Sequence, residues 1–444
     1  MFGKGMQLGL LRGCQVLGTR LAFPHGSQAE ELQAWAAYAR VCAWQAAGVV
    51  AAAAREIARF APANPTSVLE FPMAAPRLDL RDNALVVSFA DTDGVTYPAI
   101  WLRDNCPSAL HPDTHERVLD LLSLAEAPRL DEARIEGDAV LLSYADGHVS
   151  RMPLALLDAH RPGRPATDPA AIVPELWRAD LGVSGIPRFA AEAVMDSDAE
   201  LEAWMRETAR FGLSIIDGLA DSADAGMAVA QRIGFLRRTN FGQEFEVISV
   251  PKPNNLAYTA IALPLHTDLP NQEVPPGFQF LHCLANAAKG GESIFADGFM
   301  IAEDLRSLDP AAFELLSTVP IPFRFHDEDY DIRVREPVII RDRAGAVTEL
   351  RYNAHIAGVF DMPAEVMPEY YRAYRALMTL TRDARYRLTF MLQPGEMVVF
   401  DNRRALHGRE AFDPATGYRH LHGCYVDRGE FLSRLRILAR GPAG

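Results

Sequence analysis

Two histidines and one aspartate form the most chemically distinctive pattern in the chain. His266 and Asp268 are separated by a single residue, and His407 lies far downstream. In an extended strand, residues i and i+2 point to the same side, so His266 and Asp268 can face one cavity while Thr267 faces away. Two imidazoles and one carboxylate can occupy one face of an octahedral metal, as in non-haem Fe(II) oxygenases. We therefore predict that these three side chains bind iron, with His407 arriving from a different strand.

The His-x-Asp spacing is weakly specific when it stands alone. A second copy, His111-Pro112-Asp113, occurs in the same chain, and its proline is typical of a turn. Histidines in the core or on the surface are also commoner than metal ligands. The interpretation of His266 and Asp268 therefore depends on the residues around them.

A candidate carboxylate-binding group follows the second histidine. Arg419 lies one predicted strand after His407, and Gly290-Gly291-Glu292-Ser293 combines a tight turn with a hydroxyl. A buried arginine can hold a carboxylate through two parallel hydrogen bonds, and a serine can add a third. An iron oxygenase that cleaves O₂ needs a two-electron co-reductant. A keto diacid bound to the metal at one end and to Arg419 at the other would supply it. The alternatives are an ordinary ion pair for Arg419, or a metal-dependent hydrolase that leaves Arg419 without a role.

Aromatic side chains lie close to the candidate ligands in the sequence. They are Phe241, Phe245, Tyr258 and Tyr425. Aromatic faces attract quaternary ammonium groups through cation–π interactions. The alternative is that these rings belong to the ordinary core, as most aromatic residues do.

Composition excludes several classes of protein. The chain has 444 residues and a net charge of −14, which disfavours nucleic acid and anionic membranes as partners. It has only three lysines, Lys4, Lys252 and Lys289, so a lysine nucleophile or Schiff base is not expected. Five scattered cysteines indicate a reducing compartment. No apolar run approaches the roughly 18 residues of a membrane span, and we expect a cytoplasmic protein.

Three regions are expected along the chain. Residues 1–68 are Ala-rich and read as an extension, partly helical over 34–60 or poorly ordered. A mitochondrial targeting segment is the alternative, which acidic residues such as Glu30 and Glu56 disfavour. Residues 70–165 form a small β-rich accessory domain with strands at 84–89 and 139–144, and residues 187–440 form the main domain.

The main domain is mainly β with flanking helices, an α+β arrangement. Helices are predicted at 223–237, 300–318 and 364–382, and another begins after Ser197, which has Glu200 at the capping-box position. Strands are predicted at 213–216, 263–267, 278–283, 292–295, 337–340, 349–352, 386–392, 397–400 and 419–425. Many short strands with Gly and Pro between them favour a double-stranded β-helix, or jelly roll, in which inward side chains converge on one pocket.

Short motifs around the candidate ligands occur in the order found in one known family. They are Trp101-Leu102-Arg103-Asp104-Asn105-Cys106, Asn254-Asn255-Leu256-Ala257-Tyr258-Thr259, Leu265-His266-Thr267-Asp268, Pro275-Pro276-Gly277-Phe278-Gln279-Phe280-Leu281-His282-Cys283, Gly290-Gly291-Glu292-Ser293, Asp297-Gly298-Phe299, Phe400-Asp401-Asn402-Arg403, Leu406-His407-Gly408-Arg409, Arg419-His420-Leu421, Gly423-Cys424-Tyr425 and Ser433-Arg434-Leu435-Arg436-Ile437-Leu438. Over residues 70–440 the chain resembles the γ-butyrobetaine dioxygenase and trimethyllysine dioxygenase family, which are TauD-like Fe(II)/2-oxoglutarate-dependent dioxygenases.

The resemblance implies a set of roles. Iron would be held by His266, Asp268 and His407, with O₂ and 2-oxoglutarate as co-substrates. Arg419 would bind the distal carboxylate of 2-oxoglutarate, with Ser293 as a helper. The substrate-binding residues would be Phe241, Phe245, Tyr258, Leu269 and Tyr425 around the trimethylammonium group, and Asn255 and Asn353 at the other end.

The implied substrate is a small quaternary ammonium compound, with γ-butyrobetaine, a precursor in carnitine biosynthesis, as the leading candidate. Phe241, Phe245 and Leu269 stand where the human-type γ-butyrobetaine enzyme has Tyr, Trp and Tyr. Phenylalanine still presents a π face, but tryptophan is the stronger cation binder. Trimethyllysine and a trimethylammonium phosphonate are therefore alternative substrates, and a ligand-binding homologue with reduced turnover is the alternative function.

The family often carries a structural zinc in the accessory domain, bound by three closely spaced cysteines and a later histidine. Here Cys106 and His148 remain, Ser108 replaces one cysteine, and His111 is a possible third ligand. A structural zinc usually needs four nitrogen or sulfur ligands, so a zinc-free loop is the alternative. The family also suggests a homodimer.

Overall fold

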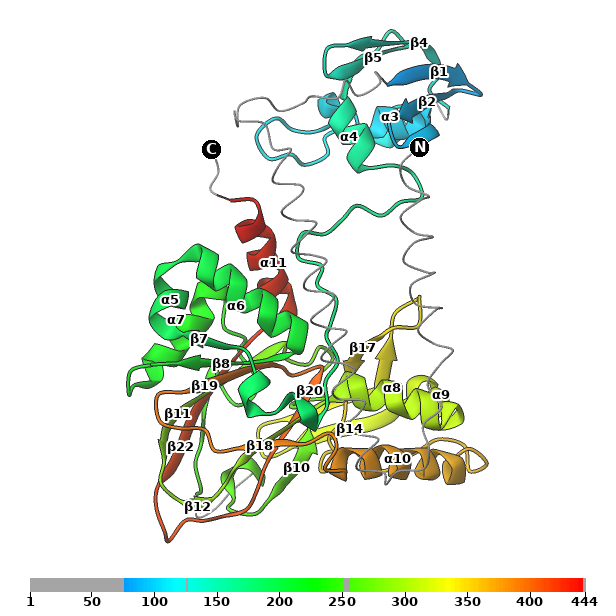
Figure 1. The fold of residues 1–444 in the computed structure, drawn as a ribbon. Coiled ribbons are helices and arrows are strands. Elements are labelled where there is room, and N and C mark those ends of the chain that lie inside the picture. Colours follow the sequence, from blue (N-terminus) through cyan, green and yellow to red (C-terminus); the bar gives the residue numbers. More distant parts are fainter. Residues whose placement is uncertain (1–75, 125–126, 251–255, 442–444) are drawn as a thin grey trace, which may run out of the picture. The chain divides into compact units, whose positions relative to one another are not determined.

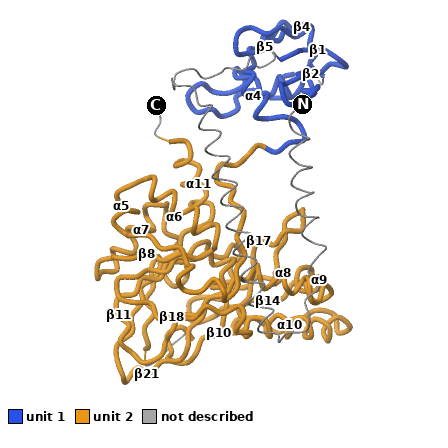
Figure 2. Tube along the Cα trace, viewed as in Figure 1, with its two compact units in different colours: residues 1–165 blue, residues 166–444 orange. Residues whose placement is uncertain are grey.

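The computed structural model describes residues 76–124, 127–250 and 256–441. The expected extension at 1–68, with its helix at 34–60, and Asn255 lie outside these residues. The chain divides into two compact units, 1–165 and 166–444 (Figure 2). No helix in the described part of the chain combines the length and the apolar character needed to cross a bilayer.

The first unit contains two small antiparallel sheets. One consists of β1 (Arg77–Arg81), β2 (Ala84–Phe89) and β3 (Thr92–Pro98), and the other of β4 (Leu130–Glu136), β5 (Ala139–Tyr144) and β6 (Val149–Pro153). The predicted strands at 84–89 and 139–144 are confirmed as β2 and β5. Alternate residues of these strands, such as Leu85, Val87, Val140 and Leu142, are buried in one core with Tyr97. Two short helices, α3 (Ala99–Asp104) and α4 (Leu154–Ala159), follow β3 and β6.

The second unit is the predicted double-sheet jelly roll (Figure 1). The smaller sheet has the order β10 (Leu263–His266), β20 (Ala405–Arg409), β13 (Ser293–Asp297) and β18 (Leu388–Phe390). The larger sheet has the order β7 (Arg188–Ala190), β8 (Leu213–Asp217), β19 (Met397–Asp401), β11 (Phe278–Asn286), β22 (Arg419–Val426) and β9 (Glu244–Val247). Leu281, Phe295, Phe390 and Phe400 come from both sheets and form one core cluster between them.

Helices cover the two sheets on their outer faces. The larger sheet packs against α5 (Ala191–Asp196), α6 (Asp198–Phe211), α7 (Ala223–Ile233) and α11 (Arg428–Ala439). The smaller sheet packs against α8 (Gly298–Leu308), α9 (Pro310–Thr318) and α10 (Met367–Arg382). Shorter strands complete the unit: β12 (Lys289–Gly290) pairs with β21 (Phe412–Asp413), β14 (Ile321–His326) with β15 (Asp331–Glu336), and β16 (Ile339–Arg341) with β17 (Val347–Leu350).

Local signals explain where these helices begin and end. The Ser197 hydroxyl accepts a hydrogen bond from the Glu200 amide at 3.3 Å, which confirms the predicted N-cap of α6. The predicted helix at 223–237 is four residues too long, because α7 ends at Ile233 before Gly234. The predicted single helix at 300–318 is two helices. Pro310 cannot continue a preceding helix, and the Asp309 carboxylate instead caps α9 by accepting from the Ala312 amide.

A buried ion pair ties β20 to the neighbouring elements. The Arg404 guanidinium contacts both carboxylate oxygens of Asp297, at 3.1 and 2.9 Å, and the two side chains are 2% and 0% exposed. Arg404 also donates to the backbone carbonyl of Arg210 at 2.7 Å. The residues that precede His407 are therefore fixed from both sides.

We expect Arg404→Met to lower the free energy of unfolding by about 3–5 kcal/mol, because it leaves the Asp297 charge buried without its cationic partner. Urea denaturation followed by circular dichroism would measure this change. Arg385→Met is the matched control, since the Arg385 side chain is 68% exposed in its pair with Asp383 and should matter by less than about 1 kcal/mol. Equal losses in the two variants would contradict the expectation.

Candidate metal and co-substrate site

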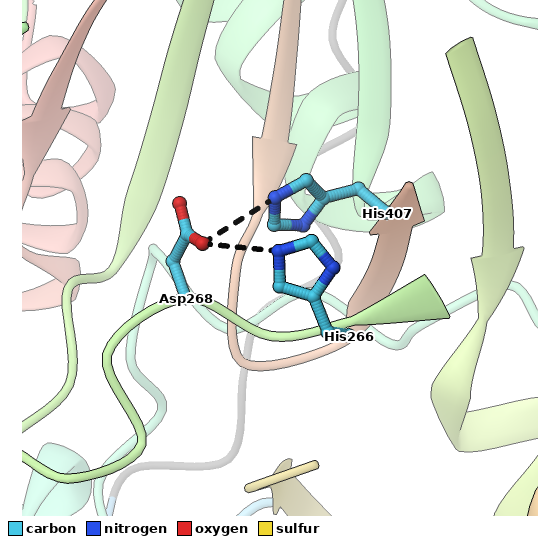
Figure 3. Close-up of side chains that lie close together, drawn as sticks. All are labelled: His266, Asp268 and His407. Atoms are coloured by element: carbon cyan, nitrogen blue, oxygen red, sulfur yellow. Dashed lines mark ion pairs between the residues drawn. The ribbon is translucent and has the colours of Figure 1, made fainter. Parts of the chain in front are cut away.

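The three predicted iron ligands lie together at the edge between β10 and β20. His266 and His407 are direct cross-strand neighbours, and their ring centroids are 4.3 Å apart. Asp268 Oδ1 lies 3.3 Å from His266 Nε2 and 3.6 Å from His407 Nε2 (Figure 3). One ligand atom from each of the three lies within 4.8 Å of the others. This spacing fits a single metal ion, and the predicted ligand set is confirmed.

Asp268 reaches this position in a different way from the one expected. The strand predicted at 263–267 ends at His266, so Asp268 lies in a bend beyond it. Its backbone is held by Asn402, whose amide side chain accepts from the Asp268 N–H at 2.7 Å and donates to the Asp268 carbonyl at 3.0 Å. The next residue, Leu269, has a left-handed backbone with φ of 53°. Thr267 does face away, as predicted, and its hydroxyl accepts from the Tyr352 amide.

Hydrogen bonds orient the ligand atoms toward one point. His266 Nδ1 lies 2.8 Å from the Pro264 carbonyl, which can only accept, so the proton is on Nδ1 and Nε2 keeps its lone pair. The Tyr425 hydroxyl donates to Asp268 Oδ2 at 2.7 Å and leaves Oδ1 facing the imidazoles.

The electrostatics of the triad favour the protonation states that a cation requires. Burial alone would raise the pKa of Asp268, but the adjacent imidazoles of His407 and His266 lower it well below its usual value. The hydrogen bond from Tyr425 contributes to the same lowering. Burial and the neighbouring His266 lower the pKa of His407 to about 3. Asp268 is therefore a carboxylate and His407 a neutral imidazole at neutral pH.

We expect Tyr425→Phe to weaken iron binding by about ten- to a hundredfold, because groups that orient a metal ligand have effects of this size. The substitution keeps the ring and removes only the hydroxyl that donates to Asp268. An anaerobic titration of Fe(II) would give the affinity. Tyr258→Phe is the matched control, since its hydroxyl makes no described bond to Asp268. The role assigned to the Tyr425 hydroxyl would be wrong if both variants bound iron as the native chain does.

The triad opens into a cavity of about 310 Å³, at the low end of small-molecule sites, which span about 300–1,000 Å³. Arg419 and Ser293 line it and are buried. Nε and Nη1 of Arg419 are buried without a hydrogen-bond partner. Burial lowers the pKa of Arg419 to about 10, so it remains a cation at neutral pH. A bound carboxylate would satisfy these donors.

The predicted glycine turn makes room for this arginine. A β-carbon added at Gly291 would lie only 3.1 Å from Arg419 Nε, and Gly291 has φ of 82°. Both facts favour glycine at this position, because a side chain would displace the guanidinium and strain the backbone. The turn that precedes Ser293 therefore serves the arginine directly.

The predicted substrate residues within the described chain line the same cavity. They are Phe241, Phe245, Tyr258, Leu269, Asn353 and Tyr425. Phe245 stacks on Tyr425 with ring centroids 5.0 Å apart. Phe241 instead packs edge-on against Phe325 at 5.3 Å. Four of the aromatic lining residues thus form two pairs on the cavity wall.

Further lining residues had not been predicted as site residues. They include Asn271, Gln279, Phe325, His355 and Arg409. Gln279 and Arg409 carried a usable signal, since each lies an even number of residues from an inward residue of its own strand, Leu281 and His407. Phe325 belongs to β14, a strand that had not been predicted.

The possible zinc site in the accessory unit is not assembled as suggested. Cys106 Sγ lies 3.9 Å from His148 Nε2 and 3.0 Å from the Ser108 hydroxyl. His111 does not join them, because its Nδ1 accepts from the backbone amides of its own turn, at Asp113 and Thr114. Among the described residues, the one group of three metal-binding side chains is the His266 triad. The structure does not bring His111 together with Cys106 and His148, and zinc binding by this loop stays a prediction.

A jelly roll in which two histidines on neighbouring strands and an aspartate just after one of them meet beside a cavity defines a non-haem iron oxygenase. Comparison with known sequences extends this conclusion. Residues 174–425 match the family described as taurine catabolism dioxygenase TauD, TfdA family, and residues 77–156 match gamma-butyrobetaine hydroxylase-like, N-terminal. The chain belongs to the γ-butyrobetaine and trimethyllysine dioxygenase family, and it is a 2-oxoglutarate-dependent dioxygenase that uses Fe(II).

The match to each of three relatives covers most of that relative's own length. The gamma-butyrobetaine dioxygenase of Pseudomonas sp. (strain AK-1) is 41% identical over 376 residues, which are 83% of this chain and 98% of that protein. The human gamma-butyrobetaine dioxygenase is 31% identical over 78% of this chain and 92% of its own. The mitochondrial trimethyllysine dioxygenase of Gallus gallus is 30% identical over 81% of this chain and 87% of its own. Both substrate classes are thus represented among the relatives.

Proposed function

We propose that this enzyme hydroxylates a C–H bond of a small trimethylammonium compound, with γ-butyrobetaine as the leading candidate. The observation that carries the proposal is the pair of stacked rings, Phe245 and Tyr425, in the same cavity as the triad. The relative with 41% identity acts on γ-butyrobetaine according to its name, which supports the same choice here.

Each group would have a distinct task. His266, Asp268 and His407 would hold Fe(II), which would supply O₂ activation coupled to decarboxylation of 2-oxoglutarate to succinate. Arg419 pairs with the distal carboxylate of 2-oxoglutarate, and the Ser293 hydroxyl assists. The aromatic rings hold the cationic head, while Asn353, together with Asn255 outside the described residues, meets the other end of the substrate. Gripping both ends leaves one carbon facing the metal, and such orientation accounts for much of an enzyme's rate advantage.

Trimethyllysine is the second candidate, and a trimethylammonium phosphonate is a third. The cavity wall supports these two alternatives. Phe241 packs against Phe325, and Leu269 contributes no aromatic ring for a cation. The trimethyllysine dioxygenase of Gallus gallus at 30% identity also supports this alternative. A longer substrate with an amino acid end would need more polar partners at the far end of the cavity.

A succinate-release screen tests the proposal. The iron-loaded enzyme would be mixed anaerobically with 2-oxoglutarate and one of γ-butyrobetaine, trimethyllysine or a trimethylammonium phosphonate, and O₂ would then be added. We expect γ-butyrobetaine to stimulate succinate formation most strongly, with hydroxylated product in equal amount. Strongest stimulation by another candidate would replace the leading substrate. Binding of iron and 2-oxoglutarate without stimulation by any candidate would favour a ligand-binding homologue.

We expect Phe245→Leu to raise the KM for γ-butyrobetaine about tenfold, because it removes a π face worth roughly 1–2 kcal/mol to a desolvated cation. Phe245→Trp is the matched control and should leave the KM equal or lower. A neutral analogue with a tert-butyl group in place of trimethylammonium separates the two contributions of the ring. If the substitution weakened both compounds equally, burial rather than charge would explain the effect.

A further inference from the structure

We propose that Arg409 is a positioning residue that couples the co-substrate end of the cavity to the segment carrying Tyr258. Binding of 2-oxoglutarate would then stabilise residues 256–261 and so prepare the substrate cage. The proposal goes beyond the proposed function, since it needs only the co-substrate and makes no use of the substrate's identity.

One side of Arg409 holds the substrate segment. Arg409 lies on β20, two residues after His407, and is 5% exposed. Its Nη1 donates to the Ala257 carbonyl at 3.2 Å, and its Nη2 donates to the carbonyls of Thr259 and Ile261 at 2.7 and 2.9 Å. A single guanidinium thus binds three carbonyls that surround Tyr258 in the chain.

The other side of Arg409 faces the co-substrate end. Its Nε is buried without a hydrogen-bond partner, as are Nε and Nη1 of Arg419. Both guanidinium groups lie against the ring of Phe412, at 4.9 and 5.6 Å from its centroid. Phe412 also donates its backbone N–H to the Ala260 carbonyl at 3.1 Å, so it touches the same segment. Phe412 thus lies against both arginines and the substrate segment.

The charge at this end is unbalanced in the free enzyme. Neither Arg409 nor Arg419 forms an ion pair with an acidic side chain among the described residues, and each is buried. Two buried cations without an anion repel each other, and each costs desolvation free energy. The distal carboxylate of 2-oxoglutarate would remove this cost and satisfy the three unused nitrogens. Arg409 would then be fixed, and its three bonds to the substrate segment with it.

Coupling of this kind is reciprocal. If 2-oxoglutarate stabilises the segment, then a well-ordered segment must strengthen 2-oxoglutarate binding by the same factor. The bonds to Ala257, Thr259 and Ile261 are the physical link that both sites share.

Hydrogen exchange tests the coupling directly. Iron-loaded protein under argon would be studied with and without 2-oxoglutarate, at ten times the Kd of each variant, and exchange would be followed in a peptide covering residues 256–262. In the native chain we expect 2-oxoglutarate to slow exchange there at least about threefold. In Arg409→Gln we expect the Kd for 2-oxoglutarate to rise about tenfold and the slowing to disappear.

Two further variants make the result decisive. Arg409→Lys keeps the charge but not the planar fork, so it should bind 2-oxoglutarate more tightly than Arg409→Gln while still losing the slowing. If Arg409→Gln does not fold, Arg409→Lys alone tests the proposed coupling. Arg387→Gln, in a partly exposed pair with Glu410, is the control and should behave as the native chain does. Equal slowing in the native chain and the Arg409 variants, or none in the native chain, would overturn the proposal.

Discussion

Replacing His266 with alanine should abolish iron-dependent succinate formation, with a loss of at least about a thousandfold, because the metal carries the O₂ chemistry and loses one of three protein ligands. Iron should also be lost on anaerobic dialysis. The fold should persist, since the described polar contacts of His266 are confined to its neighbours Pro264, Asp268 and His407. Iron content per chain, succinate release and circular dichroism would be measured on the same sample.

The chain offers a matched control for this substitution. His111 belongs to the second His-x-Asp copy, and its ring only accepts hydrogen bonds from its own turn. His111→Ala should therefore keep its iron and its turnover. Full turnover by His266→Ala, or an equal loss of iron and turnover in the two variants, would show that His266 is not an iron ligand.

The iron ligands and Arg419 could be predicted from the sequence, because each lies in a short pattern of residue types or in a recognisable motif. His266 and Asp268 follow from residue types and spacing, and His407 and Arg419 from motifs in the right order. The pairing of His266 opposite His407 was not predictable, since strand register depends on how the sheet closes. The role of Asn402 was hidden for the same reason. Its bonds to Asp268 join residues more than a hundred positions apart.

Tyr425 has two roles in the site, and the sequence indicated only one of them. It was predicted for the substrate cage, and its ring does line the cavity beside Phe245. Its hydroxyl, however, donates to Asp268, which no sequence pattern indicates. A strand places the ring, and only the bend after His266 brings the carboxylate within reach of the hydroxyl.

The fold was predicted best where apolar periodicity and a cap agree. Helix α6 satisfies both, with a capping serine at its start and Gly212 in a left-handed conformation at its end. The prediction of a single helix in place of α8 and α9 was wrong because Leu305 and Phe313 keep a helical spacing across the break. Pro310 was visible in the sequence, and its local signal should have outweighed the periodicity. The hairpin of β14 and β15 was missed because the charged residues of β15, none of which is buried, resemble a loop. The alternating buried residues Ile321, Phe323 and Phe325 of β14 were a visible strand signal that the prediction overlooked.

Replacing Arg419 with methionine should raise the KM for 2-oxoglutarate by about a hundredfold or more, because truncating one partner of a buried charge pair costs roughly 2–5 kcal/mol. Iron content should not change, since Arg419 makes no described contact with the triad. Turnover should recover at high 2-oxoglutarate concentration. Arg419→Lys should be intermediate, because it keeps the charge without the bidentate geometry.

The same variant should have the opposite effect on stability. Arg419 is buried with Nε and Nη1 unpaired, so the free protein bears the desolvation cost of a cation without the partner that would offset it. Arg419→Met should therefore melt at an equal or higher temperature than the native chain when 2-oxoglutarate is absent. Adding 2-oxoglutarate should stabilise the native chain and not the variant. A structural arginine predicts the reverse pattern, in which Arg419→Met lowers the melting temperature and leaves the KM unchanged. The surface pair variant Arg387→Met should change neither quantity, which separates a site that is built for an anion from general loss of charge.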